Sequence, residues 1–345
     1  MTTPRQCAAV LGIGALLFAA AGCSQAPVSP LTPPSPSVVW PKPPDTARVR
    51  YLGCLVGSQS VCAKKSWSET WDELLHGPKP PEVFVTPHAV AVHSDGQRVA
   101  VADTNGACVH FFDLHDNRYE RLTAIGRSGS RLQCPVGVAW VGAAIWVADA
   151  KARAVAVLEG PAARWIGNDV LERPAGIAFC PENGLCYVSD SSGHAILAFD
   201  IQGTCVLRFG TRGSGPGQFN GPSHIACGPG PTLAVADSLN FRLQRLGPDG
   251  AFIGQIGRKG DAAGDLSLPK GVAFDPQGNI WVVDAHFENL QGFTPEGQLL
   301  LSVGREGQGM GEFSLPAGLT IDARGRIWVA DTYNRRVQVF ELLPS

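Results

Sequence analysis

The sequence predicts an all-β fold made of six similar units, and three observations lead to this prediction. A strand-like run that ends in Asp and continues into a polar turn occurs six times, last as IWVADTYNRRVQVF at residues 327–340. A proline followed by small and apolar residues precedes each copy, as in PAGLTI from Pro316. Between these landmarks, short runs of Val, Ile, Phe and Trp alternate with turns such as DPQG and TPEG, which is typical of successive hairpins.

The period of the repeat indicates the architecture. The recurring aspartates are 46, 41, 47, 47 and 47 residues apart, and they are Asp103, Asp149, Asp190, Asp237, Asp284 and Asp331. Each unit has room for four strands of about five residues. A repeat of this length with four antiparallel strands is the mark of a β-propeller blade. We therefore predict a six-bladed β-propeller with four-stranded blades over residues 48–345.

The units resemble the NHL repeat family. The resemblance rests on GSGPGQFNGPSHIA (213–226), GQGMGEFSLPAGLT (307–320) and DTYNRRVQVF (331–340), and with the other units it covers about three quarters of the chain. It implies a six-bladed ring. One departure stands out, because His224 occupies a position where most of the other units have Gly.

The N-terminal region supplies the strand that closes the ring. Five units end their fourth strand in an apolar residue and Gly, at Ile125–Gly126, Ile166–Gly167, Phe209–Gly210, Ile256–Gly257 and Val303–Gly304. The sixth such pair ends ARVRYLGCLVG, at Val56–Gly57. We expect residues 47–57 to form the outer strand of the last blade, beside residues 337–340, because this pairing hides an open sheet edge.

The first residues predict export and membrane anchoring. Residues 1–22, with an apolar run from Ala8 to Ala21, read as a signal peptide too short for a stable span. AAGC followed by Ser24 resembles a bacterial lipobox, which would make Cys23 a lipidated residue and place the protein in the bacterial cell envelope, on the periplasmic or cell-surface side. Residues 23–47, with eight prolines after Cys23, are predicted to be an extended tether. An ordinary signal peptide with an incidental cysteine is the alternative.

An insertion at residues 58–81 interrupts the repeat. Trp67, Trp71, Leu74 and Leu75 fall at helical spacing and predict a short helix. A link from an outer strand to the next inner strand crosses the same face of the ring as the Asp-led turns, and this face is called the top face below. We expect the apolar stripe of the helix to seal the top of the ring, and a partner-binding or gating helix is the alternative.

The cysteines fit an exported protein. Without Cys7 and Cys23 the chain has eight, an even number that favours disulfides. Cys180 and Cys186 flank one hairpin turn, and Cys54 and Cys62 are close in sequence, so both pairs are candidate disulfides. The sequence contains no C-x-x-C-H motif for covalent haem and no paired C-x-x-C motif for zinc.

Two kinds of site residue are expected on the top face. The six repeated aspartates are predicted to be structural, with carboxylates that accept N–H groups of the following turn; a carboxylate ring that binds a cation is the alternative. Residues that differ between blades are better candidates for a ligand site at the mouth of the central channel. These candidates are His88, Lys270, His286, Phe287 and Tyr333.

Two function classes follow. The first is a non-catalytic, monomeric binding or scaffold lipoprotein without a cofactor, which holds an envelope protein, peptide or glycan on its top face. The second, implied by the resemblance to propeller enzymes, is a metal-dependent lyase or lactonase with bound Ca or Zn. We expect no metal site, because His88 and His224 lie one and two positions after their prolines and should point to opposite faces of a strand. We therefore prefer the binding class.

Nucleic acid is excluded as a partner. The chain has 28 basic and 30 acidic residues, so it lacks the positive charge that phosphate backbones require.

Overall fold

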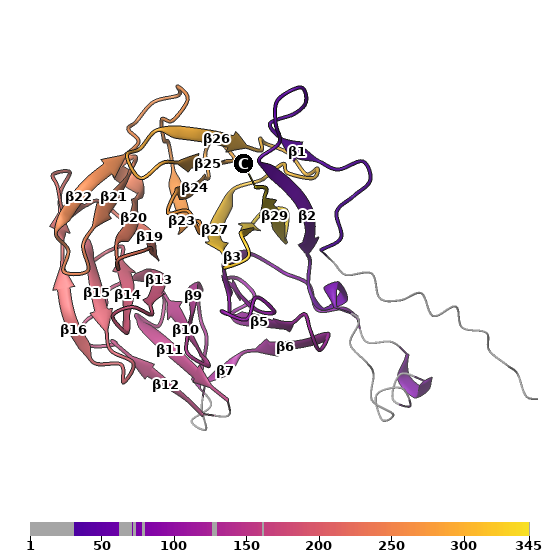
Figure 1. Ribbon diagram of the computed structural model, residues 1–345. Coiled ribbons are helices and arrows are strands. Elements are labelled where there is room, and N and C mark those ends of the chain that lie inside the picture. The colour runs from indigo at the N-terminus through magenta and orange to yellow at the C-terminus, as the bar shows by residue number, and fades with distance from the viewer. Residues whose placement is uncertain are drawn as a thin grey trace, which may run out of the picture.

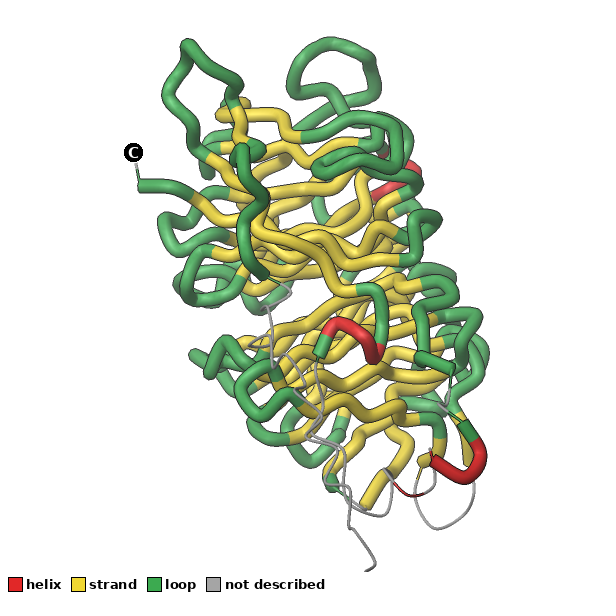
Figure 2. Tube along the Cα trace, turned by 90° about the vertical axis from the view of Figure 1, so that its right-hand side faces the viewer, coloured by secondary structure: helices red, strands yellow, loops and turns green. Residues whose placement is uncertain are grey.

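The computed structural model describes residues 31–61, 71, 74–77, 80–125, 130–160 and 162–344. They form a closed ring of six antiparallel sheets around a central channel (Figure 1). In the side view of Figure 2 the strands run between two faces on which the loops gather. The predicted six-bladed β-propeller is confirmed. Among the described residues, no helix has the length and apolar character needed to cross a membrane.

The blades follow one another in chain order, each from the channel to the rim. Blade 1 contains β3 (Pro87–Val92), β4 (Arg98–Asp103), β5 (Cys108–Asp113) and β6 (Arg118–Leu122). Blade 2 contains β9 (Pro135–Val141), β10 (Ala144–Asp149), β11 (Ala154–Glu159) and β12 (Ala162–Ile166). Blade 3 contains β13 (Pro174–Cys180), β14 (Leu185–Asp190), β15 (Ala195–Phe199) and β16 (Cys205–Phe209).

The second half of the ring repeats this plan. Blade 4 contains β19 (Pro222–Cys227), β20 (Leu233–Asp237), β21 (Arg242–Leu246) and β22 (Phe252–Ile256). Blade 5 contains β23 (Pro269–Phe274), β24 (Ile280–Asp284), β25 (Asn289–Phe293) and β26 (Leu299–Val303). Blade 6 contains β27 (Pro316–Ile321), β28 (Arg326–Asp331), β29 (Arg336–Leu342) and the N-terminal β2 (Val49–Leu55). Short strand pairs in the links are β7 (Ala124–Ile125) with β8 (Ser130–Arg131) and β17 (Thr211–Arg212) with β18 (Gln218–Phe219).

The N-terminal strand closes the ring as predicted. β2 pairs antiparallel with β29, with Tyr51 opposite Phe340. A second link joins blade 6 to blade 1, because the Thr332 hydroxyl donates a hydrogen bond of 2.9 Å to the carbonyl of Pro87. Chain segments from the two ends of the described sequence therefore share one blade (Figure 1).

The region expected to be a tether is only partly free of the propeller. β1 (Val39–Trp40) pairs with β2 and adds a fifth strand to blade 6. The Trp40 ring lies edge-on to Phe340, with ring centroids 5.7 Å apart. Packing of the Trp40 ring stabilises this part of the proline-rich segment on blade 6. The proline content alone did not predict this contact. Residues 1–30, which include the expected signal peptide and Cys23, lie outside the described residues.

The expected seal over the ring is wrong for the part of the insertion that the structure describes. A short 3₁₀ helix, η1 (Ser58–Ser60), follows β2, and the helical residues beyond it lie outside the rim of the ring in Figure 1. Leu74 and Leu75 are more than 70% exposed. Because these two side chains lie in solvent, the described part of the insertion gains little from apolar burial against the top face. Trp67 lies outside the described residues.

The hydrophobic core is divided among the six boundaries between blades. Each boundary buries one apolar cluster made by two neighbouring sheets. At the boundary of blades 6 and 1, for example, Leu55 and Trp328 pack with Val101. Every blade thus buries both of its faces, and a blade without its outer strand would leave two neighbours partly uncovered.

Substitution of Leu55 tests the closing strand. Leu55 is fully buried, so Leu55→Ala is expected to lower the free energy of unfolding by about 2 to 5 kcal/mol. The measurement is urea unfolding followed by tryptophan fluorescence. Leu239→Ala, at a largely exposed leucine, is the control and should cost less than about 0.5 kcal/mol. Equal effects of the two substitutions would show that β2 does not close the ring in solution.

Candidate functional site

The six repeated aspartates fix the top face of each blade. Each side chain is fully buried. In blade 3, Asp190 accepts hydrogen bonds of 2.8 Å from the backbone N–H of Glu172 and Arg173 and one of 2.9 Å from Gly193. The first two donors belong to the link before the inner strand, and the third belongs to the turn that follows Asp190. One carboxylate therefore ties that turn to the start of the inner strand.

The same arrangement recurs around the ring with local variation. In blades 4 and 6, side chains replace the turn N–H groups, since Arg242 donates to Asp237 and Arg336 donates to Asp331. Both arginines also donate to backbone carbonyls of the link from the preceding blade, Arg242 to Gln218 and Arg336 to Glu312. Every one of the six carboxylates accepts at least three hydrogen bonds. These contacts support the structural role expected for them and leave little capacity for a cation.

In blade 1, a cysteine and a histidine lie beside the repeated aspartate Asp103. Cys108 and His110 stand five and seven residues after Asp103, at the positions of Arg336 and Gln338 after Asp331. The His110 Nε2 atom lies 3.2 Å from Asp103 and 3.3 Å from the Cys108 sulfur, and the Tyr119 hydroxyl is 2.7 Å from Nδ1. Because a carboxylate only accepts, Nε2 carries the proton and donates to Asp103.

This cluster is the one group of three His, Cys, Asp or Glu side chains in the described part of the chain whose ligand atoms lie within 4.8 Å of one another. Burial raises the pKa of the Cys108 thiol to about 11, which keeps it protonated at neutral pH. Asp103 is also occupied by three backbone N–H groups. The cluster is explained by the same hydrogen bonding that Arg and Gln provide in blade 6, and it does not face the channel.

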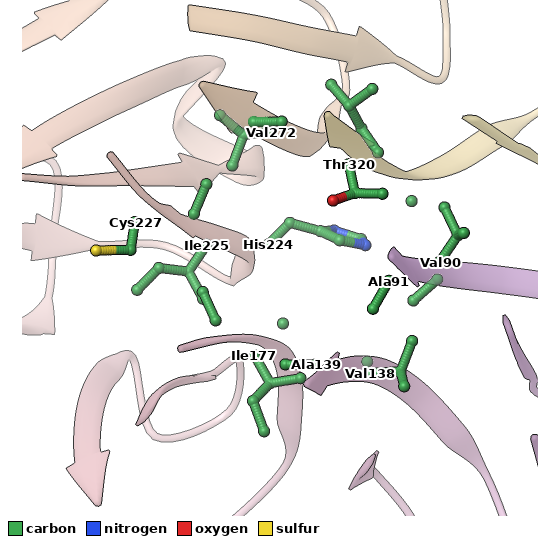
Figure 3. A pocket seen from close by; sticks show the side chains of 18 of the residues that line it. Val90, Ala91, Val138, Ala139, Ile177, His224, Ile225, Cys227, Val272 and Thr320 are labelled. Atoms are coloured by element: carbon green, nitrogen blue, oxygen red, sulfur yellow. The ribbon is translucent and has the colours of Figure 1, made fainter. Parts of the chain in front are cut away.

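The central channel encloses a cavity of about 220 Å³. Its wall consists of the six inner strands, and most of the side chains that line it are apolar, among them Val90, Ile177, Val272 and Leu319. Figure 3 shows His224 extending from β19 into the middle of this space, toward Val90 and Ala91 of β3. It is the only histidine among the described residues that line the cavity.

Glycine keeps the inner strands close at the level of His224. A Cβ atom on Gly176 would lie 2.6 Å from the Cα of His224, and one on Gly318 would lie 2.6 Å from the Cα of Ala89. Gly137 and Gly271 occupy the same position in blades 2 and 5. Only blade 4 places a large side chain there, so His224 fills a channel that the neighbouring glycines narrow.

The expectation that His88 and His224 point to opposite faces is wrong. Their rings stack with centroids 5.5 Å apart and an angle of 19° between planes. The reason is a β-bulge at the start of both inner strands, where the register shifts between Pro87 and Ala89 and between Pro222 and Ile225. An extra residue in one strand changes the side-chain alternation on which the expectation depended.

Both histidines of this stack are buried as neutral rings. The pKa of His88 is lowered to about 4, mainly by burial and also by the charge of Lys270, while the hydrogen bond with Val136 raises it. Burial also lowers the pKa of His224 well below its usual value, with smaller effects from His88 and Lys270. His88 donates from Nδ1 to the Val136 carbonyl at 2.7 Å, whereas neither nitrogen of His224 has a hydrogen-bond partner in the part of the chain that the structure describes.

Lys270 completes this arrangement. It follows Pro269 as His88 follows Pro87, so both residues occupy the same position at the top of their inner strands. Burial lowers the pKa of the Lys270 ammonium, and the nearby charge of Arg173 lowers it further. His88, His224, Lys270 and Arg173 are called the mouth cluster below. The structure thus brings together two of the expected site residues, His88 and Lys270.

The other expected site residues lie on the turns of the top face. His286 is exposed and touches Phe287, with ring centroids 5.7 Å apart. Tyr333 is 66% exposed at the position of His286 in the next blade, and Leu239 is exposed at the same position in blade 4. Blades 4 to 6 therefore present apolar and aromatic groups, whereas blades 1 to 3 have Asn105, Lys151 and Ser192 at this position.

Sequence reasoning missed His224 and Arg173 as members of the mouth cluster. A signal for His224 existed, because it replaces a glycine of the other repeats. No signal marked Arg173, which precedes the repeated proline at a position occupied elsewhere by Thr86, Cys134, Gly221, Leu268 and Leu315.

The expected disulfide between Cys180 and Cys186 is wrong. Cys180 is bonded to Cys227, with Cα atoms 5.5 Å apart, and this bond joins the inner strands of blades 3 and 4. Cys186 lies opposite Phe179, one residue out of register with Cys180, so the two cysteines face different neighbouring blades. Cys54 has a free thiol, and Cys62 lies outside the described residues.

The fold and the mouth cluster define a class: a six-bladed β-propeller with a polar candidate site where the channel opens on the top face. The chain also carries an NHL repeat, because residues 313–340 match the model of that family. No curated protein matches the sequence significantly.

Solved structures share the fold at low identity. An auxiliary nutrient binding protein from Bacteroides thetaiotaomicron is 14% identical, with a TM-score of 0.59 over 74% of this chain and 69% of that one. A structural genomics protein of unknown function from the same organism is 16% identical, with a TM-score of 0.58 over 75% and 70%. A catalytically inactive variant of virginiamycin B lyase from Staphylococcus aureus, with quinupristin, is 15% identical, with a TM-score of 0.55 over 75% and 95%.

Replacement of Asp331 tests the structural role of the repeated aspartates. Asp331→Asn removes the charge that Arg336, 13% exposed at its side chain, contacts at 2.7 Å. Loss of one partner of a buried ion pair is expected to lower the free energy of unfolding by about 3 kcal/mol. Chemical denaturation measures the change, and Asp116→Asn, at a side chain 71% exposed, is the matched control. A variant as stable as the control would contradict the structural role.

The neutral histidines predict a pH dependence of stability. Both pKa values are lowered in the folded protein, so between the unfolded value near 6.5 and the folded value the unfolded chain binds more protons. Stability should therefore fall as the pH drops below about 6.5, by up to about 1.4 kcal/mol per pH unit for each histidine.

The double variant His88→Gln/His224→Gln isolates this contribution. Its stability should fall less than that of the wild type between pH 7 and pH 5 in thermal denaturation. His115→Gln, at a side chain 79% exposed, should keep the wild-type profile. Parallel profiles of the double variant and the wild type would contradict the neutral, buried state of the pair.

Proposed function

We propose that this protein is a lipid-anchored binding propeller of the bacterial cell envelope, which holds a ligand at the channel mouth and catalyses no reaction. One observation carries the proposal: residues that differ from blade to blade, His88, His224 and Lys270, meet where the channel opens. Ligand sites in closed β rings favour such openings, where a cavity adjoins a few convergent polar groups.

The surroundings of the mouth cluster support binding of a ligand from one side. Turn residues of blades 4 to 6 supply Leu239, His286, Phe287 and Tyr333, which suit contact with the apolar or aromatic part of a peptide, glycan or protein segment. The opposite half of the ring is polar at the same position. A ligand centred on the mouth therefore meets two different surfaces and has one preferred orientation.

The anchoring part of the proposal rests on the sequence. The apolar run of residues 8–21 and the lipobox-like AAGC ending at Cys23 support export and attachment by acyl chains. The folded propeller then begins within 20 residues of Cys23, because Val39 already pairs in blade 6. We propose a monomer, since each blade buries both of its faces within the ring, and no nucleic-acid partner.

A metal-dependent lyase or lactonase is the alternative, and the similarity in fold to virginiamycin B lyase is its support. Such a reaction needs ligands for a divalent cation at the channel. The mouth cluster offers two histidines beside two cations, which repel a metal ion, and the Asp103 cluster lies within blade 1. The geometry therefore supports binding better than metal-dependent catalysis.

A variant that blocks the mouth tests this function. Ala175 follows Pro174 at the position of His88 and Lys270, so Ala175→Trp fills the mouth without removal of a charged group. Thermal shifts are measured with a panel of neutral sugars, amino acids, dipeptides and carboxylates. At least one class should stabilise the wild type and the control Ile201→Trp, whose site lies in an exposed turn between the third and fourth strands, but not Ala175→Trp.

The result that would overturn the proposal is a panel that stabilises all three proteins equally or none of them. Elemental analysis separates the alternative, which predicts one zinc or calcium ion per chain that is lost in His88→Ala. The binding proposal predicts no such stoichiometric metal.

A further inference from the structure

The mouth cluster contains two cationic side chains without a counter-charge. Lys270 and Arg173 belong to blades 5 and 3, and Arg173 lies close enough to influence the Lys270 ammonium. Within the described ranges, no carboxylate comes within 4.0 Å of either side chain as an ion-pair partner. Among the described groups that shift the pKa of His88, His224 or Lys270, none is acidic.

This absence of acidic partners is local. Elsewhere on the top face two arginines are matched, Arg242 with Asp237 and Arg336 with Asp331. The six repeated carboxylates are fully buried and saturated with donors, so they do not neutralise the mouth. A partly buried ammonium without an anion is unfavourable, because burial removes part of its hydration and nothing replaces it.

His224 supplies a donor that the protein itself does not use. The residue is 7% exposed, and both ring nitrogens are buried with no hydrogen-bond partner among the described residues. A neutral imidazole has one N–H group, and a buried donor without a hydrogen-bond partner is unfavourable. The ring is held across the channel by the stack with His88 and extends into the cavity (Figure 3).

His88 supplies the complementary group. Its Nδ1 atom lies 2.7 Å from the Val136 carbonyl, and a carbonyl oxygen only accepts, so Nδ1 carries the proton of the neutral ring. Nε2 then keeps a lone pair. The mouth cluster thus offers two cations, the N–H donor of His224, and two acceptor nitrogens, one on His88 and one on His224.

We propose that the mouth cluster is an oxyanion site, in which Lys270 and Arg173 neutralise a carboxylate or phosphate group of the ligand and His224 donates a hydrogen bond to it. This inference rests on the proposed function, because it names the chemical class of the ligand that the channel mouth holds. An oxyanion satisfies all three unmatched groups at once. A metal ion or an organic cation would add positive charge beside Lys270, and a neutral ligand would leave the ammonium without a counter-charge.

The acceptor on His88 selects among oxyanions. A hydroxyl group of the ligand, such as the P–OH of a protonated phosphate or the hydroxyl of a hydroxy acid, can donate to Nε2 while the charged oxygens face Lys270. Carboxylate and phosphate share this recognition chemistry, and the test below separates them.

The test uses the full chain and simple probes. Acetate and inorganic phosphate are titrated at constant ionic strength, with neutral acetamide as the matched control for acetate, and binding is followed by the imidazole NMR signals of His88 and His224. The signals are assigned with His88→Gln and His224→Gln. Wild-type protein should show saturable shifts with acetate or phosphate, with a dissociation constant on the order of 1 mM, and no saturable shift with acetamide.

Variants locate the charge. Lys270→Met should weaken anion binding by about 10-fold or more, whereas Lys270→Arg keeps the charge and should lose only about 2-fold. Lys151→Met removes a lysine from the top-face turn of blade 2 and should bind like the wild type. Equal binding of acetate and acetamide, or of both anions by the wild type and Lys270→Met, would overturn the inference, and so would no saturable shift with either anion.

Failure of this inference is distinguishable from failure of the proposed function. If neutral probes stabilise the wild type and Ala175→Trp abolishes this effect, the mouth binds a ligand but not through an oxyanion. If no probe, charged or neutral, separates the wild type from Ala175→Trp, the proposed function itself is wrong.

Discussion

A buried carboxylate at the end of the second strand holds the top face of every blade together. Asp190 shows the principle: two of its hydrogen bonds come from the link that leads into β13, and another comes from the turn after β14. An ionised acceptor in a buried position forms strong hydrogen bonds with N–H groups and is costly to leave unsatisfied. The link and the turn therefore have one arrangement, and the residue after the repeated proline always emerges at the channel mouth.

Because of this constraint, the residues that hold each blade together and the residues that face the channel mouth occupy different positions of the repeat. The proline and the aspartate recur in every blade, whereas the residue after the proline differs from blade to blade. This residue is His88 in blade 1 and Lys270 in blade 5. Blade 4 differs at the next position, where His224 replaces the glycine that lets the inner strands approach each other. The channel therefore opens through a narrow, positively charged mouth, and the cavity below it is lined mostly by apolar side chains.

The fold was predictable because the same sequence pattern recurs in six units. The spacing of the aspartates gave the blades, and the displaced VRYLGCL strand predicted the pairing of β2 with β29 that the structure contains. Features that depend on backbone irregularity or on contacts between blades were not predictable in the same way. A β-bulge at the start of every inner strand, including those that begin at Pro87 and Pro222, brings His88 and His224 together against the alternation of a regular strand. The bond between Cys180 and Cys227 joins two blades, and a search for local pairs could not find it. Trp40 adds a strand in a region whose prolines suggested only a tether.

The six blades present the positive charges of Lys270 and Arg173 at the channel mouth, and we propose that an anion binds there. Anomalous diffraction from crystals of the protein soaked in bromide tests this claim most directly. The account predicts a bromide peak at the channel mouth, within contact distance of Lys270 and the His224 ring. Bromide peaks confined to other surfaces, with an unoccupied mouth, would contradict it.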